Sequence, residues 1–145
     1  MMPEQSQSTR LLLKQMLDQA TVATGIHMMT NIKTAKHYSW GNGCDGWYLL
    51  ESPEMTIIQE RMPVGTAEKM HRHEKSRQFF YVLSGTAIMV HDGVSTTLNA
   101  RDGLEIAPEV AHQISNQGDI PLDIIVTSMP PSHGDRTNLP GESLR

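Results

Sequence analysis

Apolar residues recur at helical spacing in one short stretch near the start of the chain. Ser8 or Thr9 is available as the N-cap of a helix. Residues 9–20 then place apolar side chains on one side of that helix: Leu12, Leu13, Met16, Leu17 and Ala20. The pattern predicts a short amphipathic N-terminal helix.

From Trp47 onward, short apolar or alternating segments follow one another at roughly ten-residue intervals with no helical pattern between them. Turn residues separate these segments. Asp92-Gly93, for example, suits a two-residue hairpin because both residues tolerate positive φ. Such a series predicts an all-β antiparallel sandwich, barrel or jelly roll. We expect strands at 47–50, 55–62, 68–73, 78–83, 86–91, 94–98, 104–107, 112–115 and 122–128.

These patterns divide the chain into three regions. Residues 1–46 hold the helix and a lead-in segment that ends in a loop rich in glycine, with Gly41, Gly43 and Gly46. Residues 47–129 form the β-barrel. Residues 130–145 form a polar, irregular C-terminal tail.

Composition narrows the possible partners. The 145 residues carry 12 Lys and Arg against 16 Asp and Glu, a net charge of −4, which argues against a nucleic-acid or anionic membrane surface. No apolar run approaches the roughly 18 residues needed to cross a bilayer. The single cysteine, Cys44, excludes an internal disulfide and favours a reducing compartment. We expect a soluble cytoplasmic protein that binds a small molecule and no nucleic acid or membrane.

Candidate chemistry gathers around three histidines. His71 and His73 are separated by one residue, so a strand presents both imidazoles on the same face, as two ligands of one metal ion would be. The alternative is two solvated histidines. Gln78 starts the next strand and His112 a distant one, and closure of a barrel would bring all four side chains together inside. Glu74 should point away, because neighbouring strand residues face opposite ways.

These residues resemble the two sequence motifs of the cupin superfamily. The first cupin motif is matched with every spacing kept, and its single departure is Gln78 in place of a glutamate. The second motif is degenerate: only two of its positions match, while Arg101, Ala107 and Glu109 stand where Gly, Pro and Gly usually occur. The matching residues are Gly65, His71, His73, Gln78 and Gly85 in the first motif, and His112 and Asn116 in the second.

The resemblance implies a small antiparallel jelly-roll barrel that holds one divalent metal ion, Zn, Ni, Fe or Mn, through His71, His73, Gln78 and His112. It implies no single reaction. We expect an enzyme, either a dioxygenase-like oxidoreductase or an isomerase, that acts on a small polar or anionic molecule such as a sugar, keto acid or phenol. Two alternatives stay open: a metal-independent nucleotide-sugar ketoisomerase that uses histidine acid/base chemistry, and a non-catalytic ligand-binding or sensory protein.

Four neutral ligands would leave the full double positive charge on the ion, which favours an anionic substrate at its open positions. Three residues are candidates for binding that substrate. Phe80 shares the parity of Gln78, and His133 and Arg136 lie in a tail that follows Pro130-Pro131 and can fold over the barrel mouth. We also expect a homodimer, because open sheet edges and an isolated amphipathic helix both need a covering surface.

Overall fold

The computed structural model describes residues 7–24 and 28–140, with helix side chains described up to Leu17. The chain divides into two units, Met1–Thr30 and Asn31–Arg145. In the first unit, helix α1 covers Gln7–Thr24, so the predicted N-terminal helix is confirmed and is longer at both ends. Leu12, Leu13 and Met16 are exposed on it, while the side chain of Ala20 lies outside the described residues. No helix in 7–24 or 28–140 is long and apolar enough to cross a membrane.

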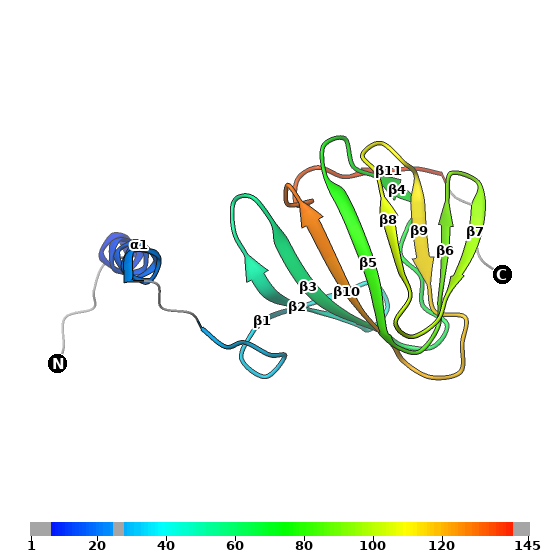
Figure 1. The fold of residues 1–145 in the computed structure, drawn as a ribbon, viewed down its shortest axis with the longest axis horizontal. Coiled ribbons are helices and arrows are strands. Elements are labelled where there is room, and N and C mark those ends of the chain that lie inside the picture. The colour runs from blue at the N-terminus through cyan, green and yellow to red at the C-terminus, as the bar shows by residue number, and fades with distance from the viewer. Residues whose placement is uncertain (1–6, 25–27, 141–145) are drawn as a thin grey trace. The chain divides into compact units, whose positions relative to one another are not determined.

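The second unit consists of two antiparallel β-sheets (Figure 1). In sheet order, the six-stranded sheet contains β1 (Lys36–Trp40), β2 (Cys44–Glu51), β3 (Thr56–Met62), β10 (Leu122–Met129), β5 (Arg77–Ser84) and β8 (Gly103–Ile106). The five-stranded sheet contains β11 (Thr137–Asn138), β4 (His71–Arg72), β9 (His112–Ser115), β6 (Ala87–His91) and β7 (Val94–Leu98).

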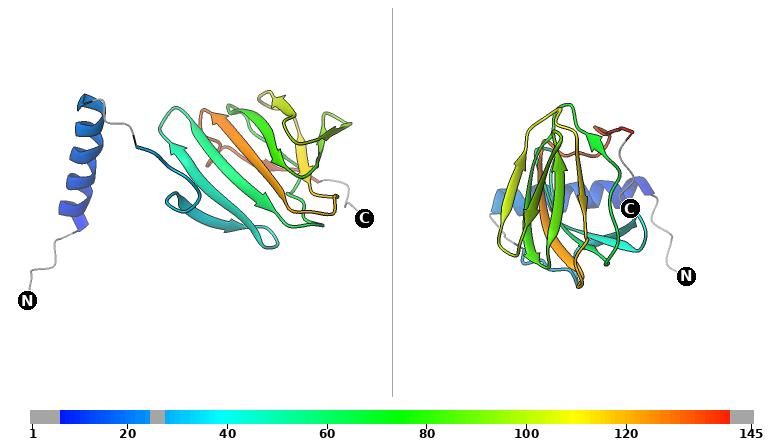
Figure 2. Two further views of the ribbon diagram at one scale, coloured as in Figure 1. Left: turned by 60° about the horizontal axis from the view of Figure 1, so that its bottom comes forward. Right: turned by 90° about the vertical axis from the view of Figure 1, so that its right-hand side faces the viewer.

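The two sheets enclose one interior (Figure 2), and strand alternation determines which side chains enter it. Along β10, every second residue from Leu122 to Ser128 is buried, and the residues between them are half-buried. Apolar side chains from both sheets form the core, among them Phe80, Val82, Met89 and Ile114. The predicted all-β jelly roll is therefore confirmed.

Two strands lie where the sequence pattern predicted none. Residues 36–51 form a hairpin of β1 and β2 in which Gly41 and Gly43 adopt positive φ, so the expected loop is a tight turn. β11 is a two-residue strand in the tail that pairs with β4. Both β1 and β11 are short and polar, with mostly exposed side chains, and therefore lack the apolar alternation that identifies a half-buried strand.

Backbone conformation accounts for the glycine positions of the motifs. Gly65 and Gly85 have φ of 83° and 85°, and a Cβ at Gly85 would lie 2.7 Å from the carbonyl oxygen of Pro121. Arg101 and Glu109, which stand where the second motif has glycine, also have positive φ, 73° and 70°. The turns of the degenerate motif are therefore kept without glycine, at a cost of about 1 kcal/mol per residue.

Candidate metal centre and its cavity

The three candidate histidines lie together inside the barrel. His71 opens β4, His73 follows that strand, and His112 opens β9, where it pairs directly with His71. All three side chains are buried, and one ring nitrogen of each lies within 4.8 Å of the other two. The predicted strand at 68–73 is regular only at His71–Arg72, yet both His71 and His73 still face the interior.

Hydrogen bonds orient all three rings in the same way. Backbone carbonyl oxygens lie against each Nδ1: that of Lys69 at 2.7 Å from His71, that of Val110 at 2.9 Å from His112, and that of Asp135 against His73. A carbonyl oxygen only accepts, so each Nδ1 carries the proton and Nε2 is left with its lone pair. Nε2 of His73 is buried without a hydrogen-bond partner. This is the tautomer that a metal-binding histidine requires.

Burial also keeps two of these imidazoles neutral. Desolvation lowers the pKa of His71 to about 3 and that of His112 to about 4, although the bond from each Nδ1 to a carbonyl acts in the opposite direction. Both rings are therefore unprotonated at neutral pH and available as ligands. For the same reason they are poorly matched to carrying protons near pH 7.

Gln78 enters the same site from β5, on the opposite sheet. Its Nε2 donates to Ser128 Oγ at 3.0 Å, and its Oε1 lies 3.1 Å from His112 Nε2. The side chain of Glu74 is exposed, as strand parity predicted. Three imidazole nitrogens and one amide oxygen therefore meet in a buried position, a donor set that suits a divalent transition metal.

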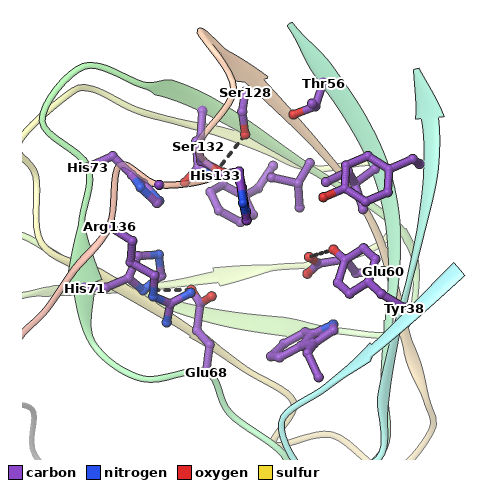
Figure 3. Close-up of a pocket in the computed structure, with 17 residues that line it drawn as sticks. Tyr38, Thr56, Glu60, Glu68, His71, His73, Ser128, Ser132, His133 and Arg136 are labelled. Carbon is purple, nitrogen blue, oxygen red and sulfur yellow. Dashed lines mark hydrogen bonds and ion pairs between the residues drawn. The ribbon is translucent and has the colours of Figure 1, made fainter. Parts of the chain in front are cut away.

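A cavity of about 440 Å³ opens from this cluster (Figure 3). The three residues predicted to bind substrate all line it: Phe80 from β5, and His133 and Arg136 from the tail. The tail is fixed in place by Asp135, whose carboxylate accepts hydrogen bonds from the backbone N–H groups of Glu74, Lys75 and Ser76. The structure thus places a cation and an imidazole beside the histidine cluster.

Two carboxyl groups that the sequence analysis did not single out also line the cavity, Glu60 and Glu68. Burial raises the pKa of Glu60 to about 7 and that of Glu68 to about 8, while the nearby Arg136 charge lowers both. Glu68 Oε1 lies 4.0 Å from His71 Nδ1 and accepts from the Ile114 N–H. Tyr38 donates to Glu60 at 3.0 Å, and burial raises its own pKa. Two carboxyl groups that hold their protons more strongly than usual therefore line the cavity beside the histidine cluster.

Strand alternation could have identified one of these residues. Glu60 shares its parity with Ile58 and Met62 in a segment that was predicted to be a strand, so it had to face inward. Tyr38 gave no such signal because β1 itself was not predicted. Glu68 precedes the regular part of β4, and only the fold brings it to His71.

Comparisons with known proteins agree with this geometry. Residues 58–128 match the family model of the cupin domain. An uncharacterized protein of Methanocaldococcus jannaschii is 32% identical over 83 residues, which cover 57% of this chain and 66% of that protein. The chain thus spans just under two thirds of the length of this relative.

Two solved structures share the fold at low sequence identity. A predicted oxalate decarboxylase from Thermotoga maritima superimposes with a TM-score of 0.67 and 17% identity, covering 72% of this chain and 100% of that one. An RmlC-like cupin from Shewanella frigidimarina gives a TM-score of 0.67 and 21% identity, covering 74% and 95% of the two chains. These likenesses concern the fold, which hosts many different activities.

Proposed function

Because this chain belongs to the cupin superfamily through the domain at residues 58–128, we propose that it is a metal-dependent enzyme acting on a small polar or anionic molecule. His71, His73 and His112 would bind one divalent ion, with Gln78 as the fourth ligand. Zn, Ni, Fe and Mn are the candidate ions. When bound, such an ion polarises a substrate oxygen and stabilises the negative charge that develops on it.

One observation carries the proposal: three buried histidines offer their ring nitrogens to one point, each with Nδ1 against a backbone carbonyl. An unpartnered buried Nε2, as on His73, costs free energy unless a cation or donor meets it. Arg136 and His133 border the cavity and would bind an anionic part of the substrate. Phe80 would pack against its apolar part.

The two alternatives predict different behaviour. A metal-independent ketoisomerase needs a histidine that titrates near neutrality, and the lowered pKa values of His71 and His112 make these two residues poorly suited to that role. A sensory protein would bind ligand without turnover. Within the metal-dependent proposal, both a dioxygenase-like oxidoreductase and an isomerase remain candidates.

Metal analysis of the purified protein tests the proposal. We expect about one divalent ion per chain, and single His71→Ala, His73→Ala and His112→Ala changes should each release it. His37→Ala is the matched control, because His37 is exposed on β1 and pairs with Asp45 outside the cluster. Metal content that is unchanged in all three variants would refute the ligand assignment. A protein that folds and turns over substrate without metal would favour the ketoisomerase.

A cytoplasmic location and a homodimer complete the proposal. Cys44 is a free, buried thiol, which suits a reducing compartment. The apolar residues exposed on α1 and the open edges of both sheets favour association with a second copy of the chain.

A further inference from the structure

The cavity has a second polar end, opposite the histidines. Tyr38 and Glu60 lie on the far side of the cavity from His71 and His73 (Figure 3). Thr56 also lines the cavity, from the cross-strand row of Ser128 and Gln78. We call Tyr38 and Glu60 the distal subsite. The apolar side chains of Ile58, Phe80 and Val126 line the cavity as well. They form one cross-strand row on β3, β10 and β5, between the row of Gln78 and that of Glu60.

The backbone is built to bring Tyr38 to Glu60. In the strand register, Tyr38 of β1 pairs with Gly46 of β2, and Gly46 in turn pairs with Glu60 of β3. The Tyr38 ring therefore crosses the middle strand, and a Cβ at Gly46 would lie only 2.1 Å from Cζ of the ring. Only glycine allows this crossing, at the end of which the phenol donates to Glu60 Oε1 at 3.0 Å. The second Glu60 oxygen is left for another partner.

Thr56 supplies an unsatisfied hydroxyl. Its side chain is only 5% exposed, and its Oγ1 is buried without a hydrogen-bond partner. Figure 3 shows this hydroxyl on the cavity side. A buried hydroxyl without a partner is costly, and a ligand that both donates and accepts would remove the cost.

We propose that the distal subsite and Thr56 bind different hydroxyl groups of a polyhydroxylated small acid whose carboxylate lies at the metal and Arg136 end. The inference rests on the proposed function, because it assumes that the histidine end binds the anionic group. A hydroxyl both donates and accepts, so one hydroxyl group can bond with the Glu60 carboxyl and another with Thr56. A second carboxylate at the distal subsite would bring only acceptors and would meet like charge whenever Glu60 is ionised. A wholly apolar chain would leave Thr56 Oγ1 unpaired. The cavity of about 440 Å³ has the size of a small-molecule site.

Two probes of equal charge and chain length test the proposal: D-gluconate and hexanoate, titrated calorimetrically into the metal-loaded protein. Hexanoate lacks every hydroxyl and so reports on the metal and Arg136 end alone. We expect gluconate to bind at least about tenfold more tightly than hexanoate, since a site built for hydroxyl groups discriminates against ligands that lack them. Metal content measured after each titration excludes extraction of the ion by gluconate.

Matched variants test which residues cause the preference for gluconate over hexanoate. Thr56→Val removes the hydroxyl at constant shape, and Glu60→Gln removes the carboxylate. Each should weaken gluconate binding about tenfold, leaving hexanoate binding and metal content unchanged. Thr56→Ser keeps the hydroxyl and should bind gluconate as the native protein does. Gly46→Ala should displace Tyr38 and lower gluconate affinity, while Thr97→Val, at an exposed position on β7, should change nothing.

The outcomes separate this inference from the proposed function. If the histidine variants lose metal but both probes bind equally well, the metal site is supported and the distal subsite is refuted. Tighter binding of hexanoate, or failure of metal-loaded protein to bind gluconate, would overturn it too. An equal loss of affinity for both probes in Thr56→Val and Glu60→Gln would assign these residues to the fold instead. Absence of bound metal refutes the proposed function itself.

Discussion

Gln78 and His112 present two acceptor atoms to each other. His112 carries its proton on Nδ1, against the Val110 carbonyl, so the lone pair of Nε2 faces Gln78 Oε1 across 3.1 Å. Two lone pairs at this distance repel unless a cation lies between them or the amide turns its NH₂ toward the ring. Gln78 Oε1 and His112 Nε2 would both be available as ligands of a metal ion. Without metal, the reversed amide can donate to His112 and accept from the Ser128 hydroxyl.

The first prediction follows from this pair. Gln78→Glu should raise affinity for the divalent ion at least tenfold, roughly 1.4 kcal/mol, because it adds a negative charge opposite the metal. The Ser128 hydroxyl can donate to the new carboxylate, so the side chain at position 78 keeps a hydrogen bond to Ser128. Competition with a chelator measures the difference. Weaker retention of metal in Gln78→Glu would show that position 78 does not face the ion. The control is Gln113→Glu, on the other side of β9, which should bind metal as the native protein does.

The sequence predicted the histidine cluster because a strand has a simple period and the motif spacing was intact. Both rules place His71, His73 and Gln78 without knowledge of the tertiary structure. The Nδ1 partners could not be predicted in this way. They are backbone carbonyls, and the one that binds His73 belongs to Asp135, far along the chain. Because any residue has a backbone carbonyl, no residue type in the sequence identifies these acceptors.

At the level of elements, the C-terminal tail is part of the site. β11 pairs with β4, the Leu139 N–H donates to the Met70 carbonyl at 2.9 Å, and Ser76 Oγ donates to the Pro130 carbonyl at 2.6 Å. Asp135 holds the centre of the tail. The backbone N–H of Lys75, with those of Glu74 and Ser76, lowers the pKa of its carboxyl group despite some opposing desolvation. The tail thus fixes both the His73 ring and the position of Arg136.

The second prediction is that Asp135→Ala weakens metal binding about tenfold, as loss of an outer partner of a metal ligand usually does. The three N–H groups lose their acceptor, and the carbonyl that orients His73 moves with the tail. Asp119→Ala, an exposed change in another loop, is the control and should bind metal normally. Chelator competition gives the affinities. Equal affinities in Asp135→Ala and native protein would mean that the His73 ring is oriented without the tail.

The third prediction concerns Arg136, whose side chain is exposed and bonds through Nε to Asn138 at 2.8 Å. Arg136→Ala should weaken hexanoate binding about tenfold, because the anion loses a charged partner. Metal content and thermal stability should stay nearly unchanged, since the side chain packs little. Calorimetric titration and thermal unfolding provide the two measurements. Arg101→Ala, which removes a charge outside the cavity lining, should have no effect on either.

The amphipathic helix supplies the fourth prediction. Leu11, Leu12 and Met16 are 58%, 59% and 64% exposed on α1. Most of the stability of a helix in a protein comes from packing its amphipathic face against another surface. We expect the full chain to be a dimer by light scattering. A chain starting at Met28 should become monomeric if the helix supplies the contact and should stay dimeric if the sheet edges do. A monomeric full chain would refute the homodimer.

Across the whole molecule, the sequence predicted the central strands of the two sheets but not two of the edge strands. Alternation along the central strands, such as β5 and β10, fixes one buried face and so predicts the jelly roll. The edge strands β1 and β11 could not be found, because each is stabilised by pairing with a neighbour and buries little of its own. Tyr38 of the distal subsite was missed with β1, since its side chain reaches the cavity only through that strand.

The buried histidine and glutamate side chains make the stability of the metal-free protein depend on pH in two opposing ways. The pKa values of His71 and His112 fall on folding from 6.5 to about 3 and about 4, so their contribution is complete above pH 6.5 and is lost as the pH falls. The pKa values of Glu60 and Glu68 rise on folding from 4.5 to about 7 and about 8. Their contribution is therefore complete below pH 4.5 and is lost as the pH rises.

The last prediction is a plateau of stability for the metal-free protein between about pH 4.5 and 6.5, where the two effects nearly cancel. Each net proton changes the free energy of unfolding by about 1.4 kcal/mol per pH unit, so stability should fall below pH 4.5 and again from pH 6.5 to 8. Urea unfolding after chelation measures the curve. Glu68→Gln should reduce the decline above pH 6.5, whereas Glu105→Gln, which is exposed on β8, should leave it unchanged. Stability that rises steadily from pH 5 to 8 would show that neither carboxyl group is protonated in the folded interior.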